Sequence, residues 1–150
     1  MMDLSLKGYF FACQKASKEM VKRGTKGSLI CISSVHSFRA AENWTPYGIA
    51  KIGVRRMVKG LAADLANTGI NSNCIAPGAI NNTIPEDDKV EPEAMDMPWV
   101  PSGRQGLPSD ISNAVIFLSS KMGEYVNGET ILVDGGLIAT GLGDGRPDGK

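Results

Sequence analysis

The chain has 150 residues, of which 42% are hydrophobic and 21% charged, and its 16 basic residues balance 16 acidic ones. This length predicts one domain with its own hydrophobic core, and the neutral balance argues against nucleic acid or an anionic membrane as a partner. The apolar runs are too short to span a bilayer and the first residues lack the order of a signal peptide, so we expect a cytoplasmic protein.

The three cysteines, Cys13, Cys31 and Cys74, are spread along the chain, and each lies in an apolar run. They form no Cys-x-x-Cys motif, and His36 is the only histidine, so we predict no metal site. Buried free thiols in a reducing compartment are favoured over a redox role.

The first predicted element is a helix over residues 1–23, in which apolar residues recur at helical spacing and Gly24 marks the end. No capping residue precedes Asp3. We therefore expect the given sequence to begin inside this helix, after the helix has already started. Residues 28–33 then form a short continuous apolar run. Such a run is typical of a strand that is buried on both faces of a parallel sheet.

The strongest helical pattern covers residues 43–67, and Gly69 follows it as a stop signal. Residues 70–78 predict a second, weaker strand that ends at a Pro-Gly break. The apolar stripe of the helix consists of Ala50, Val54, Met57, Leu61 and Leu65.

Residues 81–106 are rich in Pro, Asp and Glu without a sustained period, which is typical of a binding loop or lid. A short helix is predicted from Pro108, followed by a third buried strand over 129–136 and a flexible Gly-rich tail over 141–150. Strands separated by helices predict parallel pairing. The expected fold is therefore an α/β unit over residues 1–140, with three strands and flanking helices.

Tyr47 and Lys51 lie four residues apart in the predicted helix, so both side chains emerge on one face. A lysine ammonium near a phenol lowers the phenol pKa from about 10 toward neutrality, which a general acid/base working near neutral pH requires. Ser34 closes the preceding strand and offers a hydroxyl at the sheet edge where α/β proteins bind ligands. The Tyr-x-x-x-Lys spacing alone also occurs by chance in many helices.

Six short motifs follow one another along the chain: Ile32-Ser33-Ser34, Tyr47-x-x-x-Lys51, Ala-Pro-Gly at 76–78, Gly103-Arg104, Pro-Ser-Asp-Ile at 108–111 and Val-Asp-Gly-Gly at 133–136. Together and in this order they resemble the short-chain dehydrogenase/reductase family, from about Lys7 to Gly136. The resemblance implies the C-terminal part of a Rossmann-like, doubly wound parallel sheet. The stretches SSVHS and PGAIN are most similar to members that oxidise sugars and polyols, glucose 1-dehydrogenase among them.

The resemblance implies a role for each residue that matches a family motif. Tyr47 is then the catalytic acid/base, and Lys51 lowers its pKa and also holds the nicotinamide ribose of the cofactor. Ser34 hydrogen-bonds the reacting oxygen of the substrate, whereas Ser33 is structural.

The turn after the second strand is implied to contact the cofactor. Pro77 and Gly78 pack along the nicotinamide, and the backbone of Ile80 is available to its carboxamide. The family usually has a threonine five residues after the proline, but this position is Asn82 here, with Thr83 one residue further on. Both are candidates for cofactor binding.

Two departures from the family pattern concern the relay and the cofactor. Ser5 stands where the family usually has an asparagine that anchors a water for proton relay, so we expect a weakened relay. The implied cofactor is NAD or NADP, but the Gly-rich turn that binds its pyrophosphate does not precede Lys7. We therefore expect this chain to be the C-terminal portion of a family member, starting inside the fourth helix.

Three further residues are candidates for substrate contact. His36 lies two residues after Ser34, Trp44 lies just before the helix, and Trp99 lies in the lid. For each, an exposed or simply packed side chain is an equally good interpretation. Arg104 is expected to tie down the base of the lid.

The favoured hypothesis is an NAD(P)-dependent oxidoreductase that acts on a hydroxyl or carbonyl of a small substrate, such as a sugar or polyol. The alternative is a non-catalytic oligomerisation module that keeps family-like surfaces. An epimerase or dehydratase is disfavoured by the Ala-Pro-Gly turn and the Val-Asp-Gly-Gly end. The resemblance implies a homodimer or homotetramer, and the open edge of strand 28–33 predicts a chain of marginal stability by itself.

Overall fold

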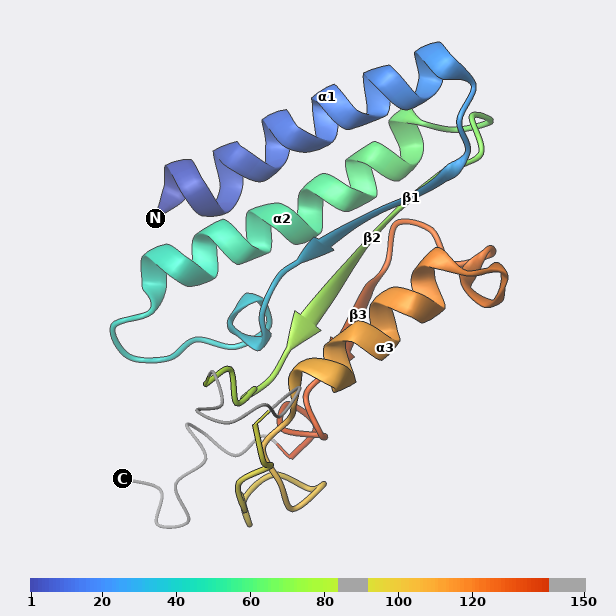
Figure 1. Cartoon of the computed structure of the whole chain (residues 1–150). Helices are drawn as coiled ribbons and strands as arrows, with labels where there is room; N and C mark the ends of the chain where they lie inside the picture. The colour runs from blue at the N-terminus through green and yellow to red at the C-terminus, as the bar shows by residue number, and fades with distance from the viewer. Residues whose placement is uncertain (84–91, 141–150) are drawn as a thin grey trace.

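The computed structural model describes residues 1–83 and 92–140 (Figure 1). Every expected helix and strand is present, with short π or 3-10 segments beside some of them. In chain order the elements are η1 (Asp3–Lys7), α1 (Gly8–Arg23), β1 (Gly27–Ile32), η2 (Val35–Ser37), α2 (Thr45–Asp64), β2 (Ile70–Pro77), α3 (Pro108–Ser119), η3 (Lys121–Gly123) and β3 (Thr130–Val133).

The three strands form a parallel sheet in the order β1-β2-β3. Helices α1 and α2 cover one face of this sheet, and α3 covers the other (Figure 1). The register places Cys31 of β1 beside Cys74 of β2, and Cys74 beside Thr130 of β3. The predicted α/β fold with a parallel sheet is therefore confirmed.

The two long helices differ from their predicted bounds for local reasons. The first begins with a π-helical turn at Asp3–Lys7 and ends at Gly24, whose φ of 65° lets its N–H reach the carbonyls of the last turn. The second ends at Asp64 rather than at residue 67. Asn67 and Gly69 both have positive φ values, 64° and 76°, which an α-helix does not accommodate.

The main core lies between α1, α2 and the sheet. It consists of Cys13, Cys31, Val54, Val58 and Cys74. Val54 and Val58 of α2 are fully buried; Val54 belongs to the predicted apolar stripe, and Val58 was not assigned to it. Burial of this stripe, rather than helix propensity, is what holds α2 on the sheet.

The opposite face of the sheet is sealed by polar as well as apolar contacts. Leu118 of α3 is buried there, and its carbonyl accepts a hydrogen bond from Ser28 of β1 at 3.0 Å. Asn73 of β2 is fully buried, yet its side-chain amide donates to Val126 and accepts from the N–H of Glu129. Because both ends of this amide are satisfied, burial of Asn73 fixes the loop that leads into β3.

Part of the predicted lid is described, and it is anchored at its base. Backbone bridges join Ile80 to Gly106 and Asp96 to Arg104. Residues 84–91 of the lid and the tail 141–150 lie outside the described residues. In the part of the chain that the structure describes, no helix has the length and apolar character needed to cross a membrane.

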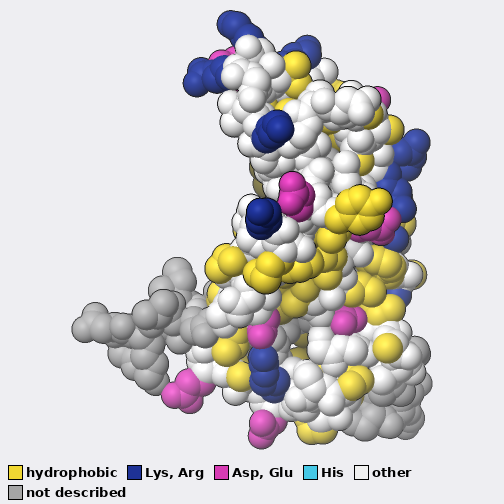
Figure 2. All heavy atoms as spheres, turned by 90° about the vertical axis from the view of Figure 1, so that its right-hand side faces the viewer, with side chains coloured by type: hydrophobic (Ala, Val, Ile, Leu, Met, Phe, Trp, Pro, Cys, Tyr) yellow, Lys and Arg dark blue, Asp and Glu magenta, His cyan; other side chains and the backbone are white. Residues whose placement is uncertain are grey.

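Apolar side chains are also exposed on the surface. Figure 2 shows hydrophobic side chains gathered across the middle of one face of the molecule. Within the described ranges β1 pairs only with β2, so its other edge carries no strand. The exposed large hydrophobic residues on the three helices include Phe10, Phe11, Ile49, Ile52 and Ile116.

Truncating Val58 tests how much the buried face of α2 contributes to stability. Val58→Ala should lower the free energy of unfolding by about 2 kcal/mol, because it removes buried methyl groups and leaves a cavity. Ile52→Ala is the matched control on the same helix, since Ile52 is 52% exposed, and it should change stability by less than about 0.5 kcal/mol. Urea denaturation followed by circular dichroism measures both. Equal effects would contradict this account of the core.

Candidate active site

A cavity of about 450 Å³ opens at the carboxyl ends of β1 and β2. The start of α3 closes it on one side and α2 borders it on another. The residues that line it are Ile32, Ser33, Ser34, Tyr47, Lys51, Pro77, Gly78, Ile80, Asn82, Pro108 and Ile111. The fold therefore brings Ser34, Tyr47 and Lys51 together with the predicted cofactor-contacting turn.

Lys51 is the most constrained side chain of this cavity. It is 8% exposed, and its ammonium donates a hydrogen bond to the carbonyl of Ile32 at 2.9 Å. The Nζ atom lies 5.4 Å from the centre of the Tyr47 ring and 5.5 Å from the centre of the Tyr9 ring. Burial lowers the pKa of Lys51, because water no longer solvates the charged form. The ammonium thus sits beside the two aromatic rings, which stabilise it in place of water.

The two serines at the end of β1 play different parts. The hydroxyl of Ser33 donates to the backbone carbonyl of Lys51 at 2.9 Å, so it joins β1 to α2. The hydroxyl of Ser34 accepts the N–H of His36 at 3.2 Å and caps η2. Accepting this bond uses a lone pair of Ser34 and leaves its O–H able to donate into the cavity.

An aromatic cluster stands beside Tyr47. The rings of His36 and Trp44 stack with their centres 4.9 Å apart, and each meets the Tyr47 ring edge to face. Burial, with a smaller contribution from Arg39, lowers the pKa of His36. His36 and Trp44 line a neighbouring hollow of about 240 Å³ rather than the cavity of Tyr47.

The turn after β2 forms the floor of the cavity. Gly78 is required here, because a Cβ atom would lie 2.7 Å from the Cα of Asp134. Of the two alternatives for the family threonine, Asn82 lines the cavity. Thr83 instead directs its hydroxyl to the side chain of Asn81 at 2.8 Å.

Like His36, Trp44 and Thr83, the predicted site residues Ser5 and Trp99 lie outside the cavity lining. The hydroxyl of Ser5 is in the π-helical turn and contacts the sulfur of Met1 at 3.4 Å. Trp99 is half-buried in the lid. The relay role of Ser5 and the substrate role of Trp99 stay predictions.

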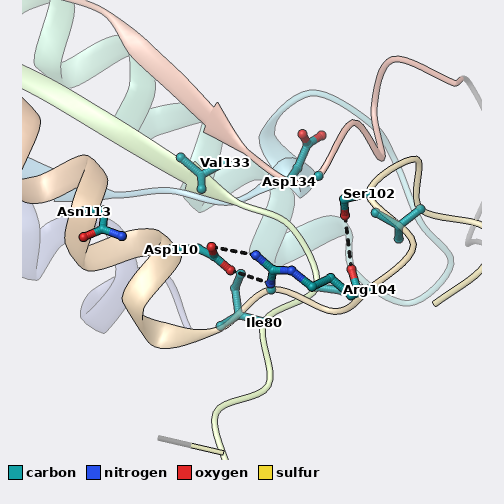
Figure 3. A pocket seen from close by; sticks show the side chains of 11 residues that line it. Ile80, Ser102, Arg104, Asp110, Asn113, Val133 and Asp134 are labelled. Carbon is teal, nitrogen blue, oxygen red and sulfur yellow. Dashed lines mark hydrogen bonds and ion pairs between the residues drawn. The ribbon is translucent and has the colours of Figure 1, made fainter. Parts of the chain in front are cut away.

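The base of the lid is held by an ion pair beside a second hollow of about 240 Å³ (Figure 3). Arg104 forms two parallel hydrogen bonds to Asp110, at 2.8 and 2.9 Å, so its predicted anchoring role is confirmed. Asp110 also accepts the N–H of Leu107 and thereby caps α3. The Arg104 hydrogen bonds, followed by that of Leu107, hold the pKa of Asp110 below its ordinary value.

Two residues that shape the site, Tyr9 and Asp134, were not predicted as site residues. Tyr9 contacts the Lys51 ammonium, and the signal for it was its position four residues after Ser5, on the same helical face. Asp134 accepts the N–H groups of Gly136 and Ile138 and so closes the turn after β3. Its signal was an Asp placed directly before paired glycines.

Known proteins match this chain over most of its length. A family model described as enoyl-(acyl carrier protein) reductase matches residues 1–138. The L-rhamnose-1-dehydrogenase of Scheffersomyces stipitis is 41% identical over 139 residues, which are 91% of this chain and 54% of that protein. The 2-dehydro-3-deoxy-D-gluconate 5-dehydrogenase of Escherichia coli K12 is 40% identical over 142 residues, which are 92% of this chain and 55% of that protein.

Solved structures give the same result. A gluconate 5-dehydrogenase from Burkholderia cenocepacia J2315, in complex with NADP and tartrate, matches with a TM-score of 0.78 at 35% identity. The match covers 93% of this chain and 55% of that one. The chain thus spans about half the length of the curated relatives that it matches.

The Arg104–Asp110 pair predicts a pH-dependent contribution to stability. Arg104→Gln should lower the free energy of unfolding at pH 7 by up to about 1 kcal/mol, because the pair is partly exposed. The pKa of Asp110 is depressed in the folded state, so this contribution is present above the unfolded pKa and is lost as the pH falls through the folded pKa. Urea titrations at several pH values measure the difference.

The exposed pair of Arg23 and Glu19 provides the control, since it joins neighbouring turns of one helix. Arg23→Gln should cost less than Arg104→Gln at neutral pH. A loss for Arg104→Gln that persists unchanged in acid would show that the ion pair is not its cause.

Proposed function

The chain belongs to the short-chain dehydrogenase/reductase family, and from this membership we propose that it supplies the catalytic side of an NAD(P)-dependent oxidoreductase. The reaction proposed is oxidation of a hydroxyl, or reduction of a carbonyl, on a small sugar or polyol. The observation that carries the proposal is that Ser34, Tyr47 and Lys51 line one cavity. These three groups provide a hydrogen-bond donor, an acid/base and a cation within one site.

The cavity fits a nicotinamide ring by its chemistry. Its volume is within the range of small-molecule sites. Pro77, Gly78 and Ile80 offer an apolar floor, whereas Lys51 and Asn82 offer polar groups. NAD(P), when bound, supplies the hydride acceptor or donor, and the residues of this chain hold the substrate and move its proton.

Proton movement is assigned to Tyr47 and Ser34. In the oxidative direction the Tyr47 phenolate takes the proton of the substrate hydroxyl, while the Ser34 hydroxyl donates to the same oxygen. Ser34 is oriented for this by accepting the N–H of His36. In the reductive direction Tyr47 returns the proton to the carbonyl oxygen.

Lys51 provides the fixed positive charge of the site. Its ammonium has three hydrogens, and the bond to Ile32 uses one of them. The other two are available for the ribose hydroxyls of the cofactor and for a water of the proton relay. We assign the distal end of this relay to Ser5, which replaces the asparagine typical of the family.

A sugar or polyol is supported by the surroundings of Tyr47. The stacked rings of His36 and Trp44 offer an aromatic surface, and Trp44 is 48% exposed. Relatives named for rhamnose and gluconate derivatives support the same class. We propose that His36, Trp44 and Trp99 contact the substrate.

Assembly into a homodimer or homotetramer in the cytoplasm completes the proposal. Phe10 on α1 and Ile49 on α2 are 47% and 55% exposed, which favours burial against a second copy. The cysteines are free thiols, as in proteins of a reducing compartment.

The non-catalytic alternative predicts oligomers by light scattering and no NAD(H) or NADP(H) binding by calorimetry.

Replacing Tyr47 tests the proposed chemistry. In the protein that carries this sequence, Tyr47→Phe should lower kcat by at least about 10²-fold, because the acid/base is removed. The assay follows the nicotinamide absorbance with L-rhamnose, gluconate and related polyols. Circular dichroism should show an unchanged fold.

Tyr125→Phe is the matched control, since Tyr125 is fully exposed, does not line the cavity and has no assigned role. It should leave turnover unchanged. Full activity in Tyr47→Phe would exclude the assignment, and a wild-type protein that binds neither NAD nor NADP would favour the non-catalytic module.

A further inference from the structure

The fold brings together two cysteines that the sequence separates by 18 residues. Cys13 faces inward from α1 and Cys31 lies in β1, and their sulfur atoms are 3.6 Å apart. Both are buried, with 8% and 2% of their surfaces exposed. The sequence predicted buried free thiols, which the structure confirms, and the structure also shows that two of them are in direct contact.

The contact is close enough for a covalent bond to form with small movements. A disulfide has a sulfur–sulfur distance of about 2.05 Å, so the two atoms need to approach by about 1.5 Å. Rotation of the two side chains and a slight shift of α1 can supply this approach. Helix α1 lies beside α2 on this face of the sheet. No described element packs on the side of α1 that faces away from α2 and the sheet (Figure 1).

The two thiols differ in acidity, so one is more readily the attacking thiolate than the other. The hydrogen bond with Cys31 lowers the pKa of Cys13. The same contact, together with burial, raises the pKa of Cys31. The other titratable groups facing the pair are Tyr9 on α1, Lys51 on α2 and Cys74 on β2, whose pKa burial raises to about 11.

We propose that Cys13 and Cys31 are an oxidation site, which a small hydroperoxide converts into a disulfide that fixes α1 to β1. The Cys13 thiolate attacks one peroxide oxygen, and the other leaves as hydroxide and is protonated to water. This step produces a sulfenic acid on Cys13. Cys31 then attacks the Cys13 sulfur and displaces hydroxide, which leaves as water with the Cys31 proton. Two thiols are oxidised and one hydrogen peroxide is reduced to two waters.

The position of the bond links it to the candidate active site. Cys31 directly precedes Ile32, whose carbonyl holds the Lys51 ammonium. A disulfide at Cys31 therefore fixes the strand end from which Ser34 and the Lys51 acceptor arise. The inference does not depend on the proposed dehydrogenase activity, because the bond is detected in the protein without substrate or cofactor.

The test is oxidation of the protein with hydrogen peroxide, followed by mass spectrometry of the intact chain and of its tryptic peptides. The expected result is the loss of two hydrogens and a link between peptides 8–15 and 27–39, with the Cys74 peptide 60–89 unmodified. Trypsin places each cysteine in a different peptide, so the link is assigned without ambiguity. The oxidised chain should unfold at a higher temperature than the reduced chain.

The rate of bond formation tests the assigned nucleophile. It should rise with pH and level off at a pH below the ordinary pKa of a thiol, because the Cys13 thiolate is the reacting species and its pKa is lowered. Cys31→Ser keeps a hydrogen-bond donor beside Cys13 but removes the second thiol, so Cys13 should stop at a sulfenic acid that a 1,3-dione traps. Cys74→Ala should form the link as the wild type does.

Four results would overturn the proposal. The first is a link through Cys74 or between two chains, and the second is oxidation of Cys13 to a sulfinic acid without a link. The third is an unmodified chain after peroxide treatment at a pH above 7. Cys13→Ser shows that the linked product requires this thiol, and a link that persists in this variant would also contradict the assignment.

Discussion

Two reciprocal hydrogen bonds between the end of β1 and the middle of α2 hold the candidate site in place. The Lys51 ammonium donates to the carbonyl of Ile32, and the Ser33 hydroxyl donates to the carbonyl of Lys51, both at 2.9 Å. Each bond joins a side chain of one element to the backbone of the other. Since Ser34 follows Ser33 and Tyr47 lies one turn before Lys51, the two bonds fix how Ser34 and Tyr47 face each other.

The parallel sheet then supplies the other walls of the site. The register of β1 and β2 brings both carboxyl ends to one edge, so Ser34 and the turn at Pro77 and Gly78 face the same cavity. The close approach of Gly78 to Asp134 fixes the height of this floor relative to the end of β3. Strand pairing therefore positions site residues that are far apart in sequence. The close packing of Gly78 against Asp134, which leaves no room for a Cβ atom, positions the turn after β2.

Local patterns in the sequence predicted the positions of helices and strands, because short-range interactions largely determine these elements. Helical periodicity placed Tyr47 and Lys51 on one face of α2. Apolar runs located the first and third strands, and a Pro-Gly break marked the end of the weaker second strand. The end of α2 was wrong, because positive φ values at Asn67 and Gly69 stop the helix earlier than its periodicity suggests. The Tyr9–Lys51 and Cys13–Cys31 contacts could not be predicted, because each joins residues brought together only by packing of α1 on the sheet and α2.

Burial of Lys51 connects the stability of this fold with its chemistry. Removing an ammonium from water is unfavourable, and burial lowers the pKa of Lys51 for this reason. The Ile32 carbonyl and the rings of Tyr9 and Tyr47 offset part of that cost. The same exclusion of water weakens dielectric screening, so the charge acts more strongly on any group beside it. A solvated lysine would cost less stability, but it would stabilise a neighbouring phenolate less. The buried position of Lys51 therefore suits the acid/base role proposed for Tyr47.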